Sequence, residues 1–144
     1  MSAFTRRLFK LFRFTRRQHG LVAMAALELA RARFALARIP AKEIIAELQD
    51  RTAPASRPEA TGDVAAISWA VRTAAAGVPW RSDCLVQSLA ASRWLKREGV
   101  MPEFRLGVTS SADGSLRAHA WLELDGVVLT GGEDVADYAV LLKS

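Results

Sequence analysis

Cysteine and histidine are scarce in this chain, and their positions limit the chemistry that it can carry. The one cysteine, Cys84, lies in the segment VPWRSDCLVQSLAASRWL, and the second of two histidines, His119, opens the segment HAWLELDGVVL. A thiolate is a strong nucleophile when a histidine can act as its base. The start of a helix favours the thiolate, because free backbone N–H groups and the positive end of the helix dipole lie there. The pair therefore indicates nucleophilic catalysis.

Each of the two residues also has a purely structural interpretation. Lone cysteines are most often small buried hydrophobic residues, and the neighbours of His119 (Ala118, Ala120 and Trp121) would suit a core histidine. Their joint placement favours the catalytic interpretation. A metal site is not expected, because His19 and His119 lie a hundred residues apart without a companion cluster. No other cofactor is expected.

Four helices are expected along the first two thirds of the chain. Residues 21–37 and 42–49 are rich in good helix formers, and Pro40 separates them because the residue before a proline avoids the helical conformation. A third helix is expected over residues 64–76, with Asp63 as its N-cap.

The fourth expected helix, residues 84–98, carries the cysteine in its first turn. Either Ser82 or Asp83 can serve as the N-cap, and Gly99 can end the helix. The carboxylate of Asp83 opposes thiolate formation unless it is turned away into a capping hydrogen bond. The N–H groups that favour the thiolate can also bind a developing oxyanion.

After Pro102 the hydrophobic pattern alternates with a period of two, which is typical of β-strands. The expected strands are residues 103–110, 116–124 and 127–131. SADGS and Asp125-Gly126 supply the turns between them. Helices followed by a three-stranded meander indicate an α+β fold in which the nucleophile helix packs on a small antiparallel sheet that carries His119.

A two-residue turn at Asp125-Gly126 predicts which residues lie opposite each other in the last hairpin. Leu124 should face Val127, and the same register places His119 opposite Gly132. Alternation divides the strand between a core face, with Ala118, Ala120, Leu122 and Leu124, and a second face, with His119, Trp121 and Glu123.

A residue that orients the imidazole should therefore lie near residues 130–134, whose sequence is TGGED. Glu133 is the first candidate and Asp134 the second, with a backbone carbonyl as the alternative. Asp125 is a poor candidate, because its turn lies at the far end of the hairpin from His119.

The length of 144 residues fits one compact domain. Residues 1–42 contain ten Lys/Arg and one acid, whereas residues 43–144 contain ten Lys/Arg and fourteen acids. We expect a basic helical region over residues 1–50, a linker over residues 51–62 that is rich in proline, serine and threonine, and a catalytic core over residues 63–144.

The single cysteine excludes an intramolecular disulfide, and an unpaired thiol suits the reducing cytosol, so a cytoplasmic location is expected. The apolar stretch over residues 21–27 ends at Glu28. A cleaved signal peptide is disfavoured, because the charged residues Glu28, Arg31 and Arg33 interrupt the apolar stretch. A transmembrane helix is not expected either, since it needs about 20 mostly apolar residues.

Three segments occur in a characteristic order: WRSDCLVQSLAASRWLKREGV, then FRLGV, then AHAWLELDG. Together with the arginine-rich helical N-terminus, they resemble the B2 proteins of lasso-peptide biosynthesis. These proteins are leader peptidases with a transglutaminase-like core of the papain type. The resemblance covers most of the chain.

This resemblance implies a Cys-His-Asp hydrolase that cuts a ribosomally made precursor peptide between leader and core. Cys84 would be the nucleophile and His119 the base, while the family's aspartate is expected where this chain has glycines, which leaves Glu133 as the candidate. The implied partners are the precursor peptide, a small leader-recognition protein and a separate ATP-using lasso cyclase.

Two other functions fit the sequence. The same fold could transfer an acyl group to an amine instead of water, as transglutaminase-like enzymes do. Alternatively, the chain could be a non-catalytic binding module built around residues 4–17, where six basic residues interleave with aromatic residues and leucines. Nucleic acid is not expected because no recognition motif accompanies them, but contact with a membrane surface or an acidic peptide stays open.

Overall fold

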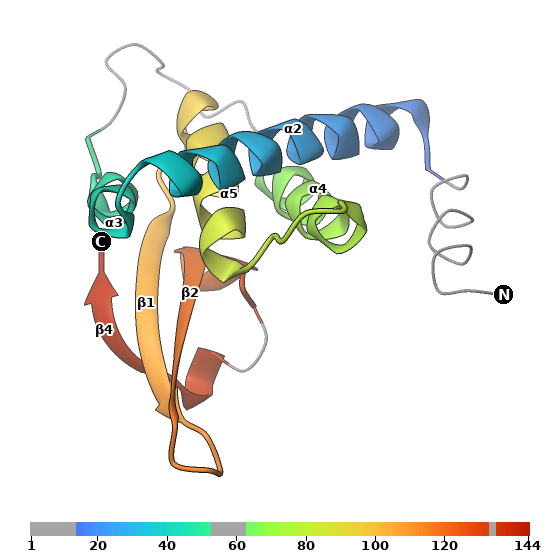
Figure 1. The fold of residues 1–144 in the computed structure, drawn as a ribbon. Helices are drawn as coiled ribbons and strands as arrows, with labels where there is room; N and C mark the ends of the chain where they lie inside the picture. Colours follow the sequence, from blue (N-terminus) through green and yellow to red (C-terminus); the bar gives the residue numbers. More distant parts are fainter. Residues whose placement is uncertain (1–13, 53–62, 133–134) are drawn as a thin grey trace, which may run out of the picture.

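The computed structural model describes residues 14–52, 63–132 and 135–144. They form an α+β fold, as the sequence predicts (Figure 1). The helices are α2 (Arg16–Arg38), α3 (Ala41–Gln49), α4 (Val64–Gly77) and α5 (Cys84–Arg97). The strands are β1 (Glu103–Ser110), β2 (Leu116–Leu124), β3 (Val127–Thr130) and β4 (Ala139–Lys143), with a 3-10 turn, η1 (Val135–Asp137), before the last. All strand pairs are antiparallel, in the order β3-β2-β1-β4.

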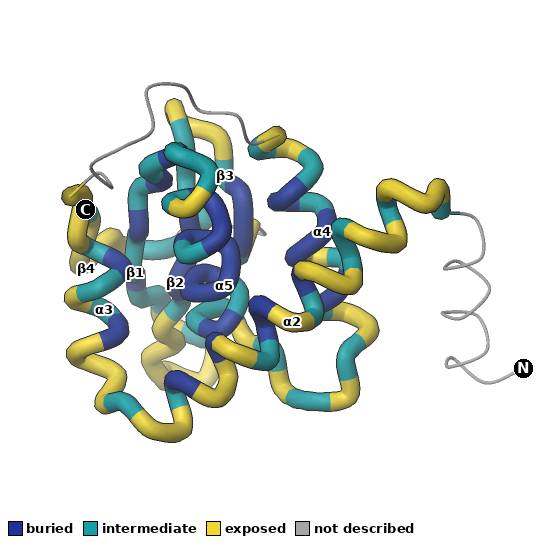
Figure 2. Tube along the Cα trace, turned by 90° about the horizontal axis from the view of Figure 1, so that it is seen from above, coloured by how far each residue is buried: buried dark blue, intermediate teal, exposed yellow. Residues whose placement is uncertain are grey.

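Helix α5 lies at the centre of the molecule, between the sheet and α2 (Figure 1). Helix α2 crosses over α4 and α5 on the side away from the sheet. Viewed from above, buried residues concentrate along α5 and the strands beneath it, whereas the N-terminal end of α2 extends into solvent (Figure 2). Leu29, Leu89, Phe104 and Leu122 are fully buried in this core, and each contributes about 1.5–3 kcal/mol through removal from water.

The helix predicted over residues 21–37 begins earlier than expected, at Arg16. Thr15 and Gln18 form a capping box, in which each side chain accepts a hydrogen bond from the other residue's backbone N–H. The predicted end is confirmed, since Ile39 is extended before Pro40.

The sheet differs from the predicted three-stranded meander in having a fourth strand. β4 pairs with the free edge of β1, so β1 becomes an inner strand. The sequence before it has no hairpin turn signal, and a short continuous apolar run does not by itself distinguish a strand from a helix. The three-strand prediction was therefore wrong at the C-terminal end.

The predicted register of the β2–β3 hairpin is correct only next to its turn. Leu124 pairs with Val127, as expected, but a bulge follows and Leu122 pairs with Thr130. The bulge gives β3 one residue more than its partner strand, and the described pairing ends there. The prediction that His119 lies opposite Gly132 was therefore wrong.

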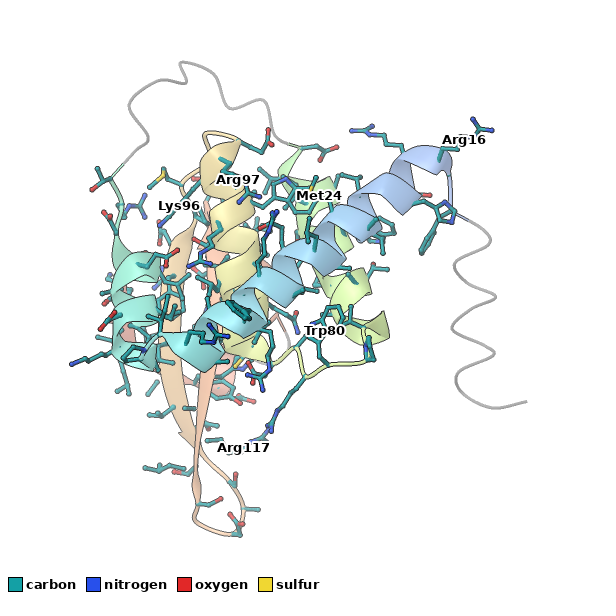
Figure 3. The ribbon with its side chains drawn as sticks, turned by 45° about the horizontal axis from the view of Figure 1, so that its top comes forward. Arg16, Met24, Trp80, Lys96, Arg97 and Arg117 are labelled. Carbon is teal, nitrogen blue, oxygen red and sulfur yellow. The ribbon has the colours of Figure 1, made fainter. Side chains whose placement is uncertain are left out.

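A buried carboxylate joins α2 to α5. Glu28 is only 2% exposed, and its Oε1 lies 2.9 Å from Nη1 of Arg31 and 2.7 Å from Nη2 of Arg97. Arg97 lies near the end of α5, next to α2 (Figure 3). Two guanidinium groups thus compensate for burying the charge.

We expect Glu28→Gln to lower the free energy of unfolding by about 1–3 kcal/mol, because a charged acceptor of two hydrogen bonds becomes neutral. Urea unfolding followed by circular dichroism measures this. Glu43→Gln, at an exposed position in α3, is the control and should cost less than about 1 kcal/mol. Equal effects of the two substitutions would show that the buried ion pairs do not hold α2 on the core.

Candidate functional site

The thiol lies at the first residue of α5, as predicted. Asp83 is the N-cap, and its Oδ1 accepts a hydrogen bond of 3.2 Å from the backbone N–H of Val86. Its other oxygen lies 3.8 Å from Nε of Arg81. The carboxylate is therefore engaged in capping and ion pairing. The Cys84 side chain is half-buried against the core.

The backbone geometry at this helix start suits an acyl-transfer reaction. The first residues of a helix have N–H groups without an intrahelical partner, and Cys84 occupies that position. Such an N–H group can stabilise the oxyanion that forms when a nucleophile attacks a carbonyl. The side chain of Gln87 also lies at this helix start, where its Nε2 donates a hydrogen bond of 2.9 Å to the carbonyl oxygen of Ser82.

His119 lies on β2, opposite Gly107 of β1. Its strand neighbours Ala120 and Leu122 belong to the core beneath the helices, so alternation places His119 on the other face of the sheet. The predicted division of β2 between two faces is confirmed in this part of the strand. The ring reaches toward β3, where its Nε2 lies 2.6 Å from the carbonyl oxygen of Gly131.

That hydrogen bond determines which ring nitrogen carries the proton. A carbonyl oxygen can only accept, so Nε2 of His119 must be the donor. In the neutral imidazole, Nδ1 then has a free lone pair and can act as a base. Once protonated, the ring would keep the same hydrogen bond. The Gly131 carbonyl therefore orients the ring in both protonation states.

A cavity of about 350 Å³ connects His119 with α5. Its lining residues are Arg72, Gln87, His119, Gly131 and Gly132. It lies where β3 ends, at the edge of the sheet. Gln87 of α5 and His119, on the far face of β2, can therefore border the same space.

Cys84 lies near this cavity, although it does not line it. Ser88, one turn further along α5, has its Oγ 3.5 Å from Oγ1 of Thr130, the last residue of β3. Cys84 shares that helix face about 6 Å nearer the start of α5. Among the described residues, no hydrogen bond joins the thiol to His119.

Two aromatic residues hold the imidazole from the other side. The ring centroids of Tyr138 and Trp121 lie 5.1 Å and 6.0 Å from that of His119. Trp121 is 2% exposed and donates from Nε1 to Glu123 at 2.7 Å, and Glu123 in turn accepts from Nε of Arg105 at 2.8 Å. Trp121, which shares the predicted face of His119, packs against the imidazole ring.

Sequence reasoning missed two residues of this site. Tyr138 is brought back to His119 only by η1 and β4, which no local pattern indicated. Arg72 carries a weak signal, since it follows Val64 and Ser68 at helical spacing on α4. Among the described residues, no three His, Cys, Asp or Glu side chains are grouped so that they could hold a metal ion.

The candidates for the third catalytic residue, Glu133 and Asp134, lie outside the described residues. Residues 53–62 of the predicted 51–62 linker and residues 1–13 of the basic segment also lie outside them. Asp125 has φ 51° in the hairpin turn and lines a different cavity, next to the turn. Its predicted structural role agrees with that position.

A family model describing the transglutaminase-like superfamily matches residues 25–143, from α2 to the end of β4. The chain belongs to the transglutaminase-like superfamily. This superfamily membership agrees with the α+β architecture. No curated protein and no solved structure matches the chain significantly. In the described part of this superfamily member, no helix is both long and apolar enough to cross a membrane.

Gly131 is the position where the site tolerates least change. It has φ 71°, and a Cβ there would lie 2.5 Å from the carbonyl oxygen of Ala120 and 3.1 Å from Nε2 of His119. Gly114 in the β1–β2 turn has φ 80° but open space around it. The two glycines share a positive φ, which a residue with a Cβ adopts only under strain, and they differ in crowding.

We expect Gly131→Ala to lower the free energy of unfolding by about 2–4 kcal/mol, through backbone strain and overpacking. Gly114→Ala should cost only about 1–2 kcal/mol, through strain alone. Urea unfolding compares them, and ¹⁵N NMR of the imidazole should show the Nε2–H form of His119 weakened only by the first. Equal free energies of unfolding for the two variants, with an unchanged His119 tautomer, would show that the close approach of Gly131 to β2 is not important.

Proposed function

We propose that this chain is a cysteine peptidase that removes the leader from a ribosomally made lasso-peptide precursor. Cys84 is the nucleophile and His119 the base. The observation that carries the proposal is the hydrogen bond from Nε2 of His119 to Gly131, which leaves Nδ1 free beside the cavity that α5 borders. Superfamily membership and the order of the cysteine and histidine segments support it.

The reaction would begin with transfer of the Cys84 proton to Nδ1 of His119 and attack of Sγ on the scissile carbonyl. The backbone N–H of Cys84 would stabilise the oxyanion. His119 would then protonate the leaving amine, which is the amino terminus of the core, and a thioester would remain on Sγ. Water, deprotonated by His119, would hydrolyse the thioester and release the leader. In free enzymes such proton-transfer contacts are often long and shorten when substrate binds.

The partners in this proposal are the precursor peptide, a small leader-recognition protein and the ATP-using lasso cyclase. The basic residues at the N-terminal end are candidates for contacting them or an acidic leader. A free thiol nucleophile suits a reducing compartment, so we place the reaction in the cytoplasm.

The decisive experiment mixes the full-length protein with a lasso-type precursor from its genomic neighbourhood and the leader-binding partner, with intact-mass spectrometry as readout. We expect cleavage at one bond, and loss of more than about a thousandfold in rate for Cys84→Ala, because the nucleophile is gone. Ser82→Ala, two residues earlier, is the matched control and should remain active.

Other outcomes are equally informative. An adduct with an added primary amine, formed faster than hydrolysis, would favour acyl transfer over proteolysis. Equal masses with wild-type protein and Cys84→Ala, when binding of the precursor is demonstrated, would make the chain a binding module with a structural cysteine.

A second experiment addresses the third catalytic residue. Because the Gly131 carbonyl already accepts the Nε2 hydrogen of His119, we expect Glu133→Gln and Asp134→Asn each to retain at least about a tenth of kcat. Single-turnover cleavage rates measure this. A fall beyond a hundredfold for Glu133→Gln, with unchanged unfolding, would instead establish its carboxylate as the group that orients His119.

A further inference from the structure

A second cavity, of about 400 Å³, lies next to the one at His119. It is formed between α4 and the β2–β3 hairpin, and apolar side chains dominate its lining. They include Val64 of α4, Leu124 of β2 and the β3 residues Val127 and Leu129. Ser68 of α4 fixes its floor, since its Oγ donates to the carbonyl of Leu129 at 2.5 Å.

Arg72 lines both cavities and therefore lies between the apolar space and His119. It follows Ser68 by one helical turn, so it extends the α4 face that borders the hairpin. The residue is exposed, and within the described residues no carboxylate forms an ion pair with it. By contrast, Arg31, Arg93 and Arg105 all contact carboxylates.

Both cavities fit a peptide better than a compact small molecule. They form two adjoining spaces along a helix and a hairpin, one lined mostly by apolar side chains and the other bordered by Arg72, Gln87 and His119. An extended peptide places successive side chains in such a row of spaces. A guanidinium group at the junction selects a carboxylate by charge and by paired hydrogen bonds.

We propose that this α4–hairpin groove binds the peptide substrate in an extended form, with an aspartate or glutamate of the substrate paired with Arg72. An apolar substrate residue, further from the scissile bond than the acidic one, occupies the cavity beside Leu129. The inference rests on the proposed peptidase function and adds its substrate preference.

The test measures binding and cleavage separately. Full-length protein carrying Cys84→Ala is titrated with fluorescein-labelled precursor peptide, in which each acidic residue within eight positions of the cleavage site is changed in turn to its amide. We expect one amide substitution to weaken binding about tenfold, and Arg72→Gln to weaken binding of the parent peptide equally. The two changes together should be no worse than either alone.

Charge reversal adds a positive outcome. Arg72→Glu should bind the parent peptide poorly and regain affinity for a peptide with lysine at the sensitive position. Lys143→Gln, which removes one positive charge at an exposed position of β4, is the matched control and should leave affinity unchanged. In the otherwise wild-type enzyme, Arg72→Gln should raise KM about tenfold and change kcat less than threefold.

The failures of the two proposals differ. Cys84-dependent cleavage with the same response to Arg72→Gln for every peptide would overturn the groove assignment alone, since Arg72 would then not recognise an acidic residue of the substrate. Absence of Cys84-dependent cleavage, with partner and precursor bound, would overturn the peptidase proposal. Additive effects of Arg72→Gln and the peptide amide substitution on binding would overturn the groove assignment as well.

Discussion

The close approach of the Gly131 carbonyl to the His119 ring determines how this site is arranged. A hydrogen bond of 2.6 Å to Nε2 requires the backbone after β3 to pass directly over β2, where a Cβ would collide with the Ala120 carbonyl. Only glycine combines that closeness with a positive φ at low cost. The glycines that stand where a family aspartate was expected thus have a positive role, because one of them lets a main-chain oxygen reach the imidazole.

The bulge in the β2–β3 ladder allows the Gly131 carbonyl to reach the His119 ring. By adding a residue at Leu129, it turns the Leu129 carbonyl toward Ser68 of α4 and ends the pairing at Thr130. The following residues are then free of the ladder and can fold toward His119. A regular hairpin would have continued along β2 and left the histidine beside a paired strand. The same bulge therefore ties β3 to α4 and opens the edge at which the cavity lies.

Features governed by neighbouring residues were predictable from the sequence, and features governed by distant contacts were not. Asp63 and Asp83 were identified as caps because their hydrogen bonds reach only three residues along the chain. The pairing of β4 with β1 and the packing of Tyr138 on His119 depend on how the chain returns to the sheet after η1. The bulge was missed because its accompanying hydrogen bond joins Leu129 to Ser68, sixty-one residues earlier in the chain. The cysteine helix and the histidine strand could thus be located, but not the atoms that orient the imidazole.

In the proposed peptidase, the arrangement of Cys84 and His119 constrains how a substrate can approach. α5 packs on the core face of the sheet, whereas His119 leaves β2 on the opposite face and bends toward the end of β3. Under that proposal, a scissile bond can meet both residues only at the sheet edge beyond Thr130, because the strands separate the two faces everywhere else. On the opposite side of His119, the path is occupied by Tyr138 and by Trp121, which Glu123 and Arg105 hold in place. The remaining approach runs between α4 and the hairpin, where the cavities lie. The early end of β3 at Thr130 therefore keeps this approach to Cys84 and His119 open.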